Sequence, residues 1–271
     1  MHRFYVSPEN WNRGALALTG SEAHHARDVL RMKTRDKLVL FNGKGREVTA
    51  EIVDLSSEGI RLRRLHEAET PPLRCRIVLA QAIPKGKNME LILQKAVEIG
   101  AAEIAPIISD RTVVQVDSES AAQKQLRWQH IAIEGAKQSG QNWLPRVHTP
   151  KKLVEFFSAV GAGVSPAKSN VPQPTRLPLQ GDITRFDLRL IGSLQPDAQH
   201  LKKILGDYSS EHQHRPRSVL MLVGPEGDFT PAELALARQH GCRPITLGPI
   251  ILRVETAAIY CLSVLSYELL I

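Results

Sequence analysis

The chain has 271 residues, of which 42% are hydrophobic and 23% are charged, a composition typical of soluble globular proteins that bury a core. Its formal net charge of +7 favours polyanionic partners, with nucleic acid first among them. The 3 cysteines are too widely spaced for a disulfide framework or a zinc signature. The amino terminus lacks an apolar signal sequence, and no apolar run reaches the ~18–20 residues of a membrane span. We therefore expect a cytoplasmic protein with no metal and no membrane partner.

Residues 1–72 are predicted to form a small β-rich module. Between Asp36 and Leu65, short β-branched runs are interrupted by Asn42-Gly43 and by Glu58-Gly59. An Asn-Gly pair between apolar runs is typical of a hairpin turn, because both residues tolerate positive φ.

One short helix is expected to interrupt these strands, from Ser21 to about Met32. Ser21 would cap this helix, because its hydroxyl can accept a hydrogen bond from an unpaired backbone N–H of the first turn. Ala26, Val29 and Leu30 would then face the core of the module.

A second domain is predicted for residues 73–271, where the pattern changes to alternating strands and helices. The expected strands cover residues 75–82, 103–109 and 218–223, and the expected helices cover 88–100, 118–139 and a further stretch opened by Thr149 as cap and Pro150 as first helical residue. Such alternation indicates a mostly parallel sheet covered by helices on both faces.

Two segments of this domain are expected to be loops without a role in chemistry. Residues 161–181 are rich in Gly, Pro and Ser and predict a surface connection, and residues 207–217 predict a second loop. His212 and His214 in the second loop would suit a metal, but no Cys or paired carboxylate accompanies them, which favours a solvated loop.

The segment Ser218–Cys242 predicts a buried strand, a tight turn at Gly224–Asp228, and a helix that opens with the capping box Thr230–Glu233. In open α/β sheets, ligands bind at turns that leave the carboxyl ends of strands. Glu226 and Asp228 would repel a polyphosphate, and the spacing matches neither a dinucleotide fingerprint nor a P-loop. A neutral or cationic ligand fits this turn better; the alternative is that the two acids only favour the helix dipole.

The end of the chain repeats this arrangement. A strand leads into the turn Leu247–Arg253, and Glu255 begins the last helix. Ile250–Leu252 are apolar residues in a loop, which indicates the lining of a dry pocket. A third turn is expected at Ile191–Ser193, and three glycine turns at one sheet edge would form a site.

Five segments together resemble one known family. The motif GPEG at Gly224–Gly227, followed by LGPIILRVETA at Leu247–Ala257, resembles the 16S ribosomal RNA uracil-N3 methyltransferases of the SPOUT, or α/β-knot, superfamily. The segment His24–Gly45 is similar to the PUA-like RNA-binding domain of that family, and Lys85–Val113 and Lys137–Val147 are similar to its middle segments.

The resemblance implies a complete architecture and an activity. The fold would be an amino-terminal PUA-like β-barrel followed by a carboxyl-terminal SPOUT α/β domain with a deep trefoil knot, an exception to the rule that chains do not thread loops. The knot and the cofactor site would lie within about residues 187–271. The enzyme would be a homodimer with each site built across the subunit interface, using S-adenosylmethionine to make N3-methyluridine in RNA of the small ribosomal subunit.

The cofactor contacts of the family correspond to the three turns. They fall on Ile191, Gly192, Ser193, Leu194, Gly224, Pro225, Glu226, Gly227, Leu247, Gly248, Ile250, Leu252 and Arg253. Adenine would lie among the apolar residues of the last turn, and the acids are compatible with a sulfonium because it is a cation.

Two residues are candidates for catalysis. Uracil N3 carries a proton at neutral pH, so a cation that stabilises enolate-like charge would accelerate transfer, and Arg253 is the first candidate. Glu226 is the second, as a group that polarises N3–H or accepts its proton. The alternative for Arg253 is a purely structural ion pair with Glu255.

RNA would be held by dispersed cations that contact phosphates irrespective of sequence. The candidates, each of which could equally be a solvated surface charge, are Arg3, Arg27, Arg31, Lys85, Lys87 and Arg111. The chain also departs from the family, which often has Glu at 137, Arg at 141, Gly at 228 and Arg at 250, where this sequence has Lys137, Gln141, Asp228 and Ile250.

The leading hypothesis is therefore an S-adenosylmethionine-dependent 16S ribosomal RNA (uracil-N3) methyltransferase whose partner is that RNA or the small subunit itself. One alternative is a SPOUT methyltransferase with a different RNA target. The other is a non-catalytic RNA-binding factor for ribosome assembly.

Overall fold

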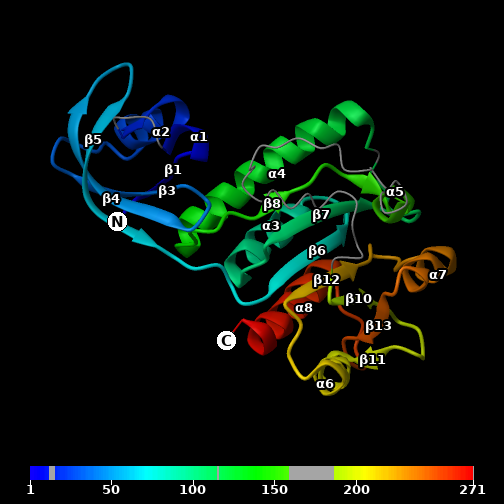
Figure 1. Cartoon of the computed structure of the whole chain (residues 1–271). Helices are drawn as coiled ribbons and strands as arrows, with labels where there is room; N and C mark the ends of the chain where they lie inside the picture. The colour runs from blue at the N-terminus through cyan, green and yellow to red at the C-terminus, as the bar shows by residue number, and fades with distance from the viewer. Residues whose placement is uncertain (12–15, 115, 159–185, 271) are drawn as a thin grey trace, which may run out of the picture.

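The computed structural model describes residues 1–11, 16–114, 116–158 and 186–270. It has a mixed α/β architecture with two sheets, a 5-stranded sheet near the amino terminus and an 8-stranded sheet that follows it. Figure 1 shows the first sheet at one end of the molecule and the second, with its helices, at the other. The expected combination of an amino-terminal β module with a carboxyl-terminal parallel sheet is confirmed.

The amino-terminal sheet has the strand order β1-β3-β4-β5-β2. Its elements are β1 (Arg3–Tyr5), α1 (Pro8–Trp11), β2 (Ala17–Leu18), α2 (Gly20–His24), the π-helical turn η1 (His25–Val29), β3 (Lys37–Phe41), β4 (Arg46–Leu55) and β5 (Ile60–Glu69). The hairpin predicted at Asn42-Gly43 joins β3 to β4, and the interruption noted at Glu58-Gly59 lies between the antiparallel strands β4 and β5. Phe4, Trp11 and Leu38 lie in the separate core of this module.

The predicted helix at 21–32 differs from the observed one. Helix α2 begins at Gly20 after Thr19 and continues as the π-helical turn from His25, and its capping position makes no side-chain hydrogen bond. Ala26 is buried as expected, whereas Val29 is 61% exposed. A π turn contains more residues than an α turn, so it rotates the later positions away from the face that an α-helical spacing predicts.

The larger sheet is formed by parallel strands in the order β11-β13-β10-β12-β6-β7-β8, with β9 also paired to β7. The strands are β6 (Arg76–Ala82), β7 (Glu103–Ile108), β8 (Arg146–Val147), β9 (Lys151–Lys152), β10 (Leu188–Gly192), β11 (Gln199–His200), β12 (Ser218–Val223) and β13 (Arg243–Thr246). The helices are α3 (Asn88–Ile99), α4 (Ser118–Ser139), α5 (Leu153–Ser158), α6 (Leu201–His212), α7 (Pro231–Gln239) and α8 (Val254–Leu269).

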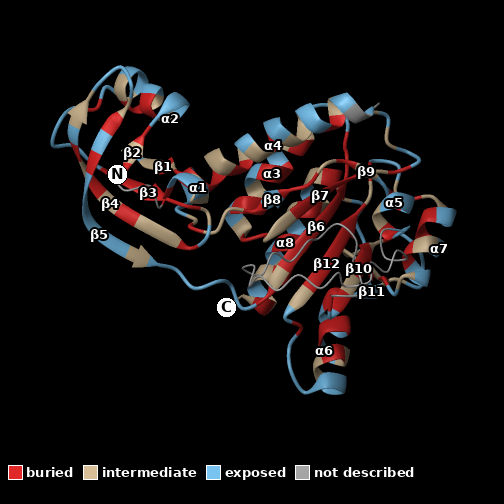
Figure 2. Cartoon of the chain, turned by 45° about the horizontal axis from the view of Figure 1, so that its top comes forward, coloured by how far each residue is buried: buried red, intermediate tan, exposed pale blue. Residues whose placement is uncertain are grey.

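Both faces of this sheet are buried under helices. Along β6, Ile77 and Leu79 join the core beneath α3, α4, α6 and α8, whereas Val78 and Ala80 join the core beneath α5 and α7. Figure 2 shows the central strands β6, β7 and β12 buried along most of their length. Such strands have near-continuous apolar sequences, which is why the sequence indicated a doubly covered parallel sheet. Within the described residues, we find no helix with the length and apolarity required to span a bilayer.

Two expected elements are wrong, and one lies outside the described residues. Thr149 and Pro150 do not open a helix; the chain extends into β9, which pairs with β7, and α5 begins only at Leu153. The stretch expected as a loop from residue 207 is helical as far as His212, because Tyr208 packs into the core and continues the inner face of α6. The predicted surface connection at 161–181 is not within the described part of the chain.

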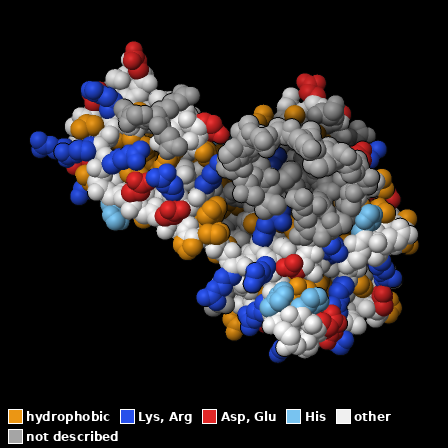
Figure 3. Space-filling model, viewed as in Figure 1, with side chains coloured by type: hydrophobic (Ala, Val, Ile, Leu, Met, Phe, Trp, Pro, Cys, Tyr) orange, Lys and Arg blue, Asp and Glu red, His pale blue; other side chains and the backbone are white. Residues whose placement is uncertain are grey.

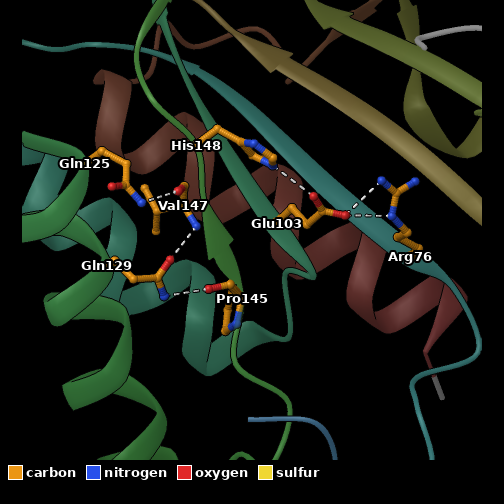
Figure 4. Close-up of polar contacts among 7 residues, drawn as sticks. All are labelled: Arg76, Glu103, Gln125, Gln129, Pro145, Val147 and His148. Carbon is orange, nitrogen blue, oxygen red and sulfur yellow. Dashed lines mark hydrogen bonds and ion pairs between the residues drawn. The ribbon is translucent and has the colours of Figure 1, made fainter. Parts of the chain in front are cut away.

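A partly buried ionic cluster joins the amino-terminal ends of β6 and β7 (Figure 4). The carboxylate of Glu103 accepts hydrogen bonds from Arg76, with Nε 2.9 Å from Oε1, and its Oε2 lies 2.9 Å from Nε2 of His148. Gln125 and Gln129 of α4 hydrogen-bond to the backbone beside and within β8, so that this short edge strand has side-chain partners. The cluster therefore lies at the amino-terminal ends of the strands. The glycine turns leave the opposite, carboxyl-terminal ends.

The β3–β4 turn fixes the amino-terminal module to the second domain. The backbone N–H of Leu144 donates to the carbonyl of Gly43 at 3.0 Å, and the N–H of Gly45 donates to the carbonyl of Asn142 at 2.9 Å. These two bonds extend the pairing of the hairpin onto the segment between α4 and β8. The predicted Asn-Gly turn therefore has a second role, as one of the contacts between the amino-terminal module and the rest of the chain.

Lys137 strengthens the same contact from α4. Its Nζ lies 2.6 Å from Oε1 of Glu22 in the amino-terminal module and 2.7 Å from Oε1 of Glu134. The Lys137 side chain is only 7% exposed. Lys137 is therefore part of an ion-pair network that links α4 to the amino-terminal module.

Candidate functional site

The three predicted glycine turns meet at one edge of the large sheet. They follow β10, β12 and β13, and because β10 lies between the other two in a parallel arrangement, all three turns leave the same edge. They surround a cavity of about 520 Å³. The lining residues are Asn88, Gly192, Ser193, Leu194, Val223, Gly224, Pro225, Glu226, Asp228, Thr246, Leu247, Gly248, Ile250, Ile251, Leu252, Arg253, Val254, Glu255 and Ala257.

Most of the expected cofactor positions line this cavity, and two do not. Ile191, at the end of β10, packs in the core beneath α5 and α7 instead of lining the cavity. Gly227 faces Arg111 instead of the cavity. Both positions alternate with residues that do line the cavity, as expected for a strand end and a tight turn.

Several lining residues were not predicted from the sequence, and Asn88 is the most informative of them. Asn88 is the first residue of α3 and reaches the cavity because β6, the strand before α3, pairs directly with β12. No local motif distinguishes it, and the signal would have been the strand order. The other missed positions, among them Thr246, Ile251 and Glu255, lie within a few residues of predicted ones in the chain.

The apolar wall of the last turn is more open than a dry pocket. Leu247 and Leu252 are partly buried, but Ile250 is 74% exposed and Ile251 is 78% exposed. Exposed isoleucines at the mouth of a cavity indicate a surface that a ligand or partner covers. Leu194 of the first turn is also exposed beside them.

The charges that line the cavity are mainly acidic. Glu226 accepts a hydrogen bond from the backbone N–H of Lys85 at 2.8 Å, and Glu255 accepts one from the side-chain amide of Asn88 at 3.2 Å. Together with Asp228 they place three carboxylates around a single guanidinium, that of Arg253. This balance favours a ligand with a positive charge, one of the two kinds, neutral or cationic, that the turn sequence predicted.

Arg253 occupies the N-cap position of α8 and is exposed toward the cavity. Its guanidinium makes neither a hydrogen bond nor an ion pair with any residue in the described ranges. The structural alternative, an ion pair with Glu255, is therefore not observed, because Glu255 is bonded to Asn88 instead. A free guanidinium in a cavity is available for a ligand or a developing negative charge.

Asp228 occupies a left-handed backbone conformation with φ of 60°. Its Oδ1 accepts a hydrogen bond from the N–H of Phe229 at 2.8 Å, and short polar side chains of this kind tolerate such a φ. Glycine, the residue that the resemblance led us to expect here, would adopt the same φ without a steric penalty.

We expect Asp228→Gly to leave the free energy of unfolding within about 0.5 kcal/mol of the wild-type value, whereas Asp228→Val should lower it by about 2 kcal/mol. Valine has a branched Cβ that clashes in the left-handed region. Urea unfolding of both variants would measure the difference, and equal stabilities would contradict this explanation.

Of the six candidate RNA contacts, three have other partners. Arg3 donates to Glu47 at 3.1 Å and to Asn142 at 2.5 Å, and Arg27 donates to Asp28 and to the carbonyl of Ser56. Arg111 donates to the carbonyl of Gly227. The side chains of Arg31, Lys85 and Lys87 are exposed and have no partner among the described residues. Figure 3 shows cations interspersed with acids across one face rather than gathered in a single patch.

The three cysteines and the two histidines His212 and His214 have packing roles and do not form a site. Burial raises the pKa of the thiols of Cys75, Cys242 and Cys261 to about 12, so these thiols remain protonated at neutral pH. His212 stacks on Tyr208 with ring centroids 4.1 Å apart, and His214 packs edge-on against both rings. In the parts of the chain that the structure describes, no three His, Cys, Asp or Glu side chains gather in a way that would hold a metal ion.

Comparison with known proteins matches two family models to the chain. Residues 71–266 match the model of an RNA methyltransferase domain, and residues 18–63 match that of an RNA methyltransferase PUA domain. The ribosomal RNA small subunit methyltransferase E of Bacillus subtilis is 31% identical over an alignment that covers 93% of this chain and 90% of that protein. Its counterpart from Synechocystis is 29% identical, covering 97% of this chain and 76% of that one.

Solved structures agree. A methyltransferase from Legionella pneumophila, in complex with the cofactor SAM, is similar with a TM-score of 0.79 and 32% identity, covering 98% of this chain and 97% of the other. The ribosomal RNA small subunit methyltransferase E of Neisseria gonorrhoeae, bound to S-adenosyl methionine, is similar with a TM-score of 0.76 and 29% identity. The match covers 99% of this chain and 98% of the other.

Proposed function

The chain belongs to the RNA methyltransferase family whose model matches residues 71–266, and from this premise we propose that it methylates N3 of a specific uridine in 16S ribosomal RNA with S-adenosylmethionine as donor. The relatives named ribosomal RNA small subunit methyltransferase E support the substrate, and the SAM-bound structures support the cofactor. The observation on which the proposal depends is that three glycine turns surround one acidic and apolar cavity that also contains a free arginine. Because ribosomal RNA is the substrate, the proposed location is the cytoplasm.

The residues of the cavity fit the proposed cofactor. A volume of about 520 Å³ is in the range of small-molecule sites, and its walls combine apolar side chains with backbone groups of the turns. Leu247, Ile250 and Leu252 would hold the adenine, while the carboxylates of Glu226 and Asp228 favour the positive sulfonium. When bound, the cofactor supplies an electrophilic methyl group. The turns at Gly192–Leu194 and Gly248 would contribute backbone contacts.

Arg253 and Glu226 are the proposed catalytic residues. As uracil loses its N3 proton, negative charge develops on its oxygens, and the free guanidinium of Arg253 would stabilise that charge. Glu226 has one oxygen bonded to Lys85, which leaves the other available to polarise or accept the proton.

The finer architecture belongs to the same proposal. We propose that residues 1–72 form a PUA-like β-barrel and that residues 73–271 form a SPOUT domain with a deep trefoil knot within about residues 187–271. The protein would act as a homodimer with the site shared between subunits. The exposed apolar residues Ile250 and Ile251 at the mouth, and Tyr260 and Tyr267 on α8, support a surface that a second subunit covers.

Nucleoside mass spectrometry of ribosomal RNA from a deletion strain would test the activity. We expect N3-methyluridine to disappear from 16S ribosomal RNA and to return when the wild-type gene is restored. Persistence of the modified nucleoside would refute the uridine N3 assignment. Calorimetric titration with S-adenosylmethionine distinguishes a methyltransferase from a non-catalytic RNA-binding factor. The methyltransferase should release heat of binding, whereas the non-catalytic factor should release none.

The segment of residues 31–37 is the proposed RNA-binding segment of the amino-terminal module. It runs from the end of η1 to Lys37, the first residue of β3, and all of its residues except Met32 are exposed. Four cations in this segment form no side-chain hydrogen bond or ion pair with the described residues; they are Arg31, Lys33, Arg35 and Lys37. Two of them have left-handed backbone conformations, with φ of 53° at Arg31 and 77° at Arg35. Free cations on one segment suit a series of phosphates.

We expect changing these four cations together to Gln to reduce the slope of log K against log[salt] for 16S ribosomal RNA by about 3, since each lost phosphate contact removes roughly 0.7 to 0.9. Filter binding at several salt concentrations measures the slope. The control is Arg61→Gln with Arg63→Gln, because these exposed arginines of β5 are paired with Asp54 and Glu51. A similar slope change in both variants would argue against a specific role for this segment.

A further inference from the structure

Arg111 lies on the back of the central glycine turn. Its Nη1 donates a hydrogen bond to the carbonyl of Gly227, and a Cβ built on Gly227 would lie 3.3 Å from Cδ of Arg111. The backbone φ of Gly227 is not in the left-handed range, so the absence of a side chain there is explained by the close approach of Arg111 and not by backbone strain. The second glycine of the GPEG motif therefore accommodates the arginine.

The loop that presents Arg111 is itself held against the start of α7. The N–H of Asp110 donates to Oε1 of Glu233 at 2.9 Å, and the hydroxyl of Thr230 donates to Oδ2 of Asp110 at 3.3 Å. Glu233 is buried, and its side chain also closes the capping box of α7. These bonds fix the position of Arg111 relative to the turn that precedes α7.

A second loop holds the same turn from the side of β6. The backbone N–H of Lys85 donates to Oε1 of Glu226 at 2.8 Å. Since β6 lies between β12 and β7 in the sheet, the turn after β12 is held by the loops that follow both β6 and β7. Gly224, Pro225, Glu226 and Asp228 line the cavity, whereas Gly227 is the member of the turn that faces away from it.

We propose that Arg111 is a positioning residue for the methyl-donor pocket, which acts by holding the carbonyl of Gly227 and thereby the turn Gly224–Asp228, and that it is not a phosphate contact. This inference rests on the proposed function, because it assigns the ordered turn to cofactor binding. A turn fixed before binding needs less ordering when the ligand enters, so its loss weakens the affinity for the cofactor more than the stability of the fold.

A double-mutant cycle with Arg111 and Gly227 tests the contact directly. Arg111→Ala should raise the dissociation constant for S-adenosylmethionine about tenfold, and Gly227→Ala should raise it about fivefold by displacing the arginine. In the double variant the new methyl group has no arginine to displace, so the dissociation constant should rise only about tenfold. Two independent effects would instead multiply to a rise of roughly fiftyfold.

Conservative variants separate the hydrogen bond from the packing. Arg111→Lys retains a donor and should stay within about twofold of the wild-type dissociation constant, whereas Arg111→Met retains only the stem and should resemble Arg111→Ala. The control is Arg127→Met, since Arg127 is an exposed arginine that pairs with Glu90 of α3. This variant should bind the cofactor as the wild type does.

The outcomes distinguish this inference from the proposed function. An additive cycle, or a reduced salt slope of RNA binding in Arg111→Ala with unchanged cofactor affinity, would overturn the positioning role alone. Weaker cofactor binding with an unchanged thermal midpoint and an unchanged RNA salt slope would support it. Wild-type protein that binds no S-adenosylmethionine would overturn the proposed function and this inference with it.

Discussion

Replacing Arg253 with Ala is expected to slow methyl transfer more than tenfold, at least about 1.4 kcal/mol in activation free energy, while S-adenosylmethionine binding is retained. Arg253 lines the cavity without a partner among the described residues, so its removal leaves no buried group unpaired. The loss should therefore appear in the rate of the chemical step. Single-turnover assays with saturating cofactor and RNA would measure it.

The pH dependence of the same variant provides a sharper test. If the guanidinium stabilises charge that develops on uracil, raising the pH should partly restore the variant, because uracil then loses its N3 proton in solution. Arg253→Lys should fall between wild type and Arg253→Ala, since it retains the charge without the planar donor geometry. An unchanged single-turnover rate in Arg253→Ala would refute the catalytic role.

The parts of the site that could be predicted from sequence are those specified by neighbouring residues. The turn Gly224–Asp228 and the capping box at Thr230–Glu233 have local signals, because proline, glycine and capping side chains determine the backbone where they occur. The parallel sheet followed from apolar strands that alternate with helices. Asn88 and Arg111 reach the site through the order of strands in the sheet, which no local pattern encodes.

Local patterns failed where tertiary contacts decided the outcome. Pairing of β9 with β7 kept Thr149 and Pro150 out of a helix, and burial of Tyr208 extended α6 through a polar sequence. A count of cations could not show that Arg3 is bonded to Glu47 and Asn142. Charge in a sequence therefore indicates a class of partner, while the ion pairs of the fold decide which cations remain available.

Replacing Gly45 with Ala is expected to lower the free energy of unfolding by about 3 kcal/mol, because the added methyl group meets both backbone strain and a steric clash. Gly45 has φ of 89°, and a Cβ there would lie 2.6 Å from the backbone carbonyl oxygen of Thr70 and 2.8 Å from the ring of Trp143. The carbonyl belongs to backbone that itself bonds Gly45, since the N–H of Thr70 donates to the carbonyl of Gly45 at 2.7 Å. The methyl group has no direction in which to move.

Gly20→Ala is the matched control, because Gly20 also has positive φ, 58°, but no atom lies within 4 Å of the added Cβ. It should cost only the conformational penalty of about 1 kcal/mol, and urea unfolding would measure both variants. Gly45 also donates to Asn142 at the contact between the domains, so its loss should loosen the module that presents the 31–37 segment. We therefore expect Gly45→Ala to bind S-adenosylmethionine normally but to methylate ribosomal RNA poorly. Equal losses in Gly20→Ala and Gly45→Ala would show that backbone strain, and not docking of the two domains, accounts for the effect.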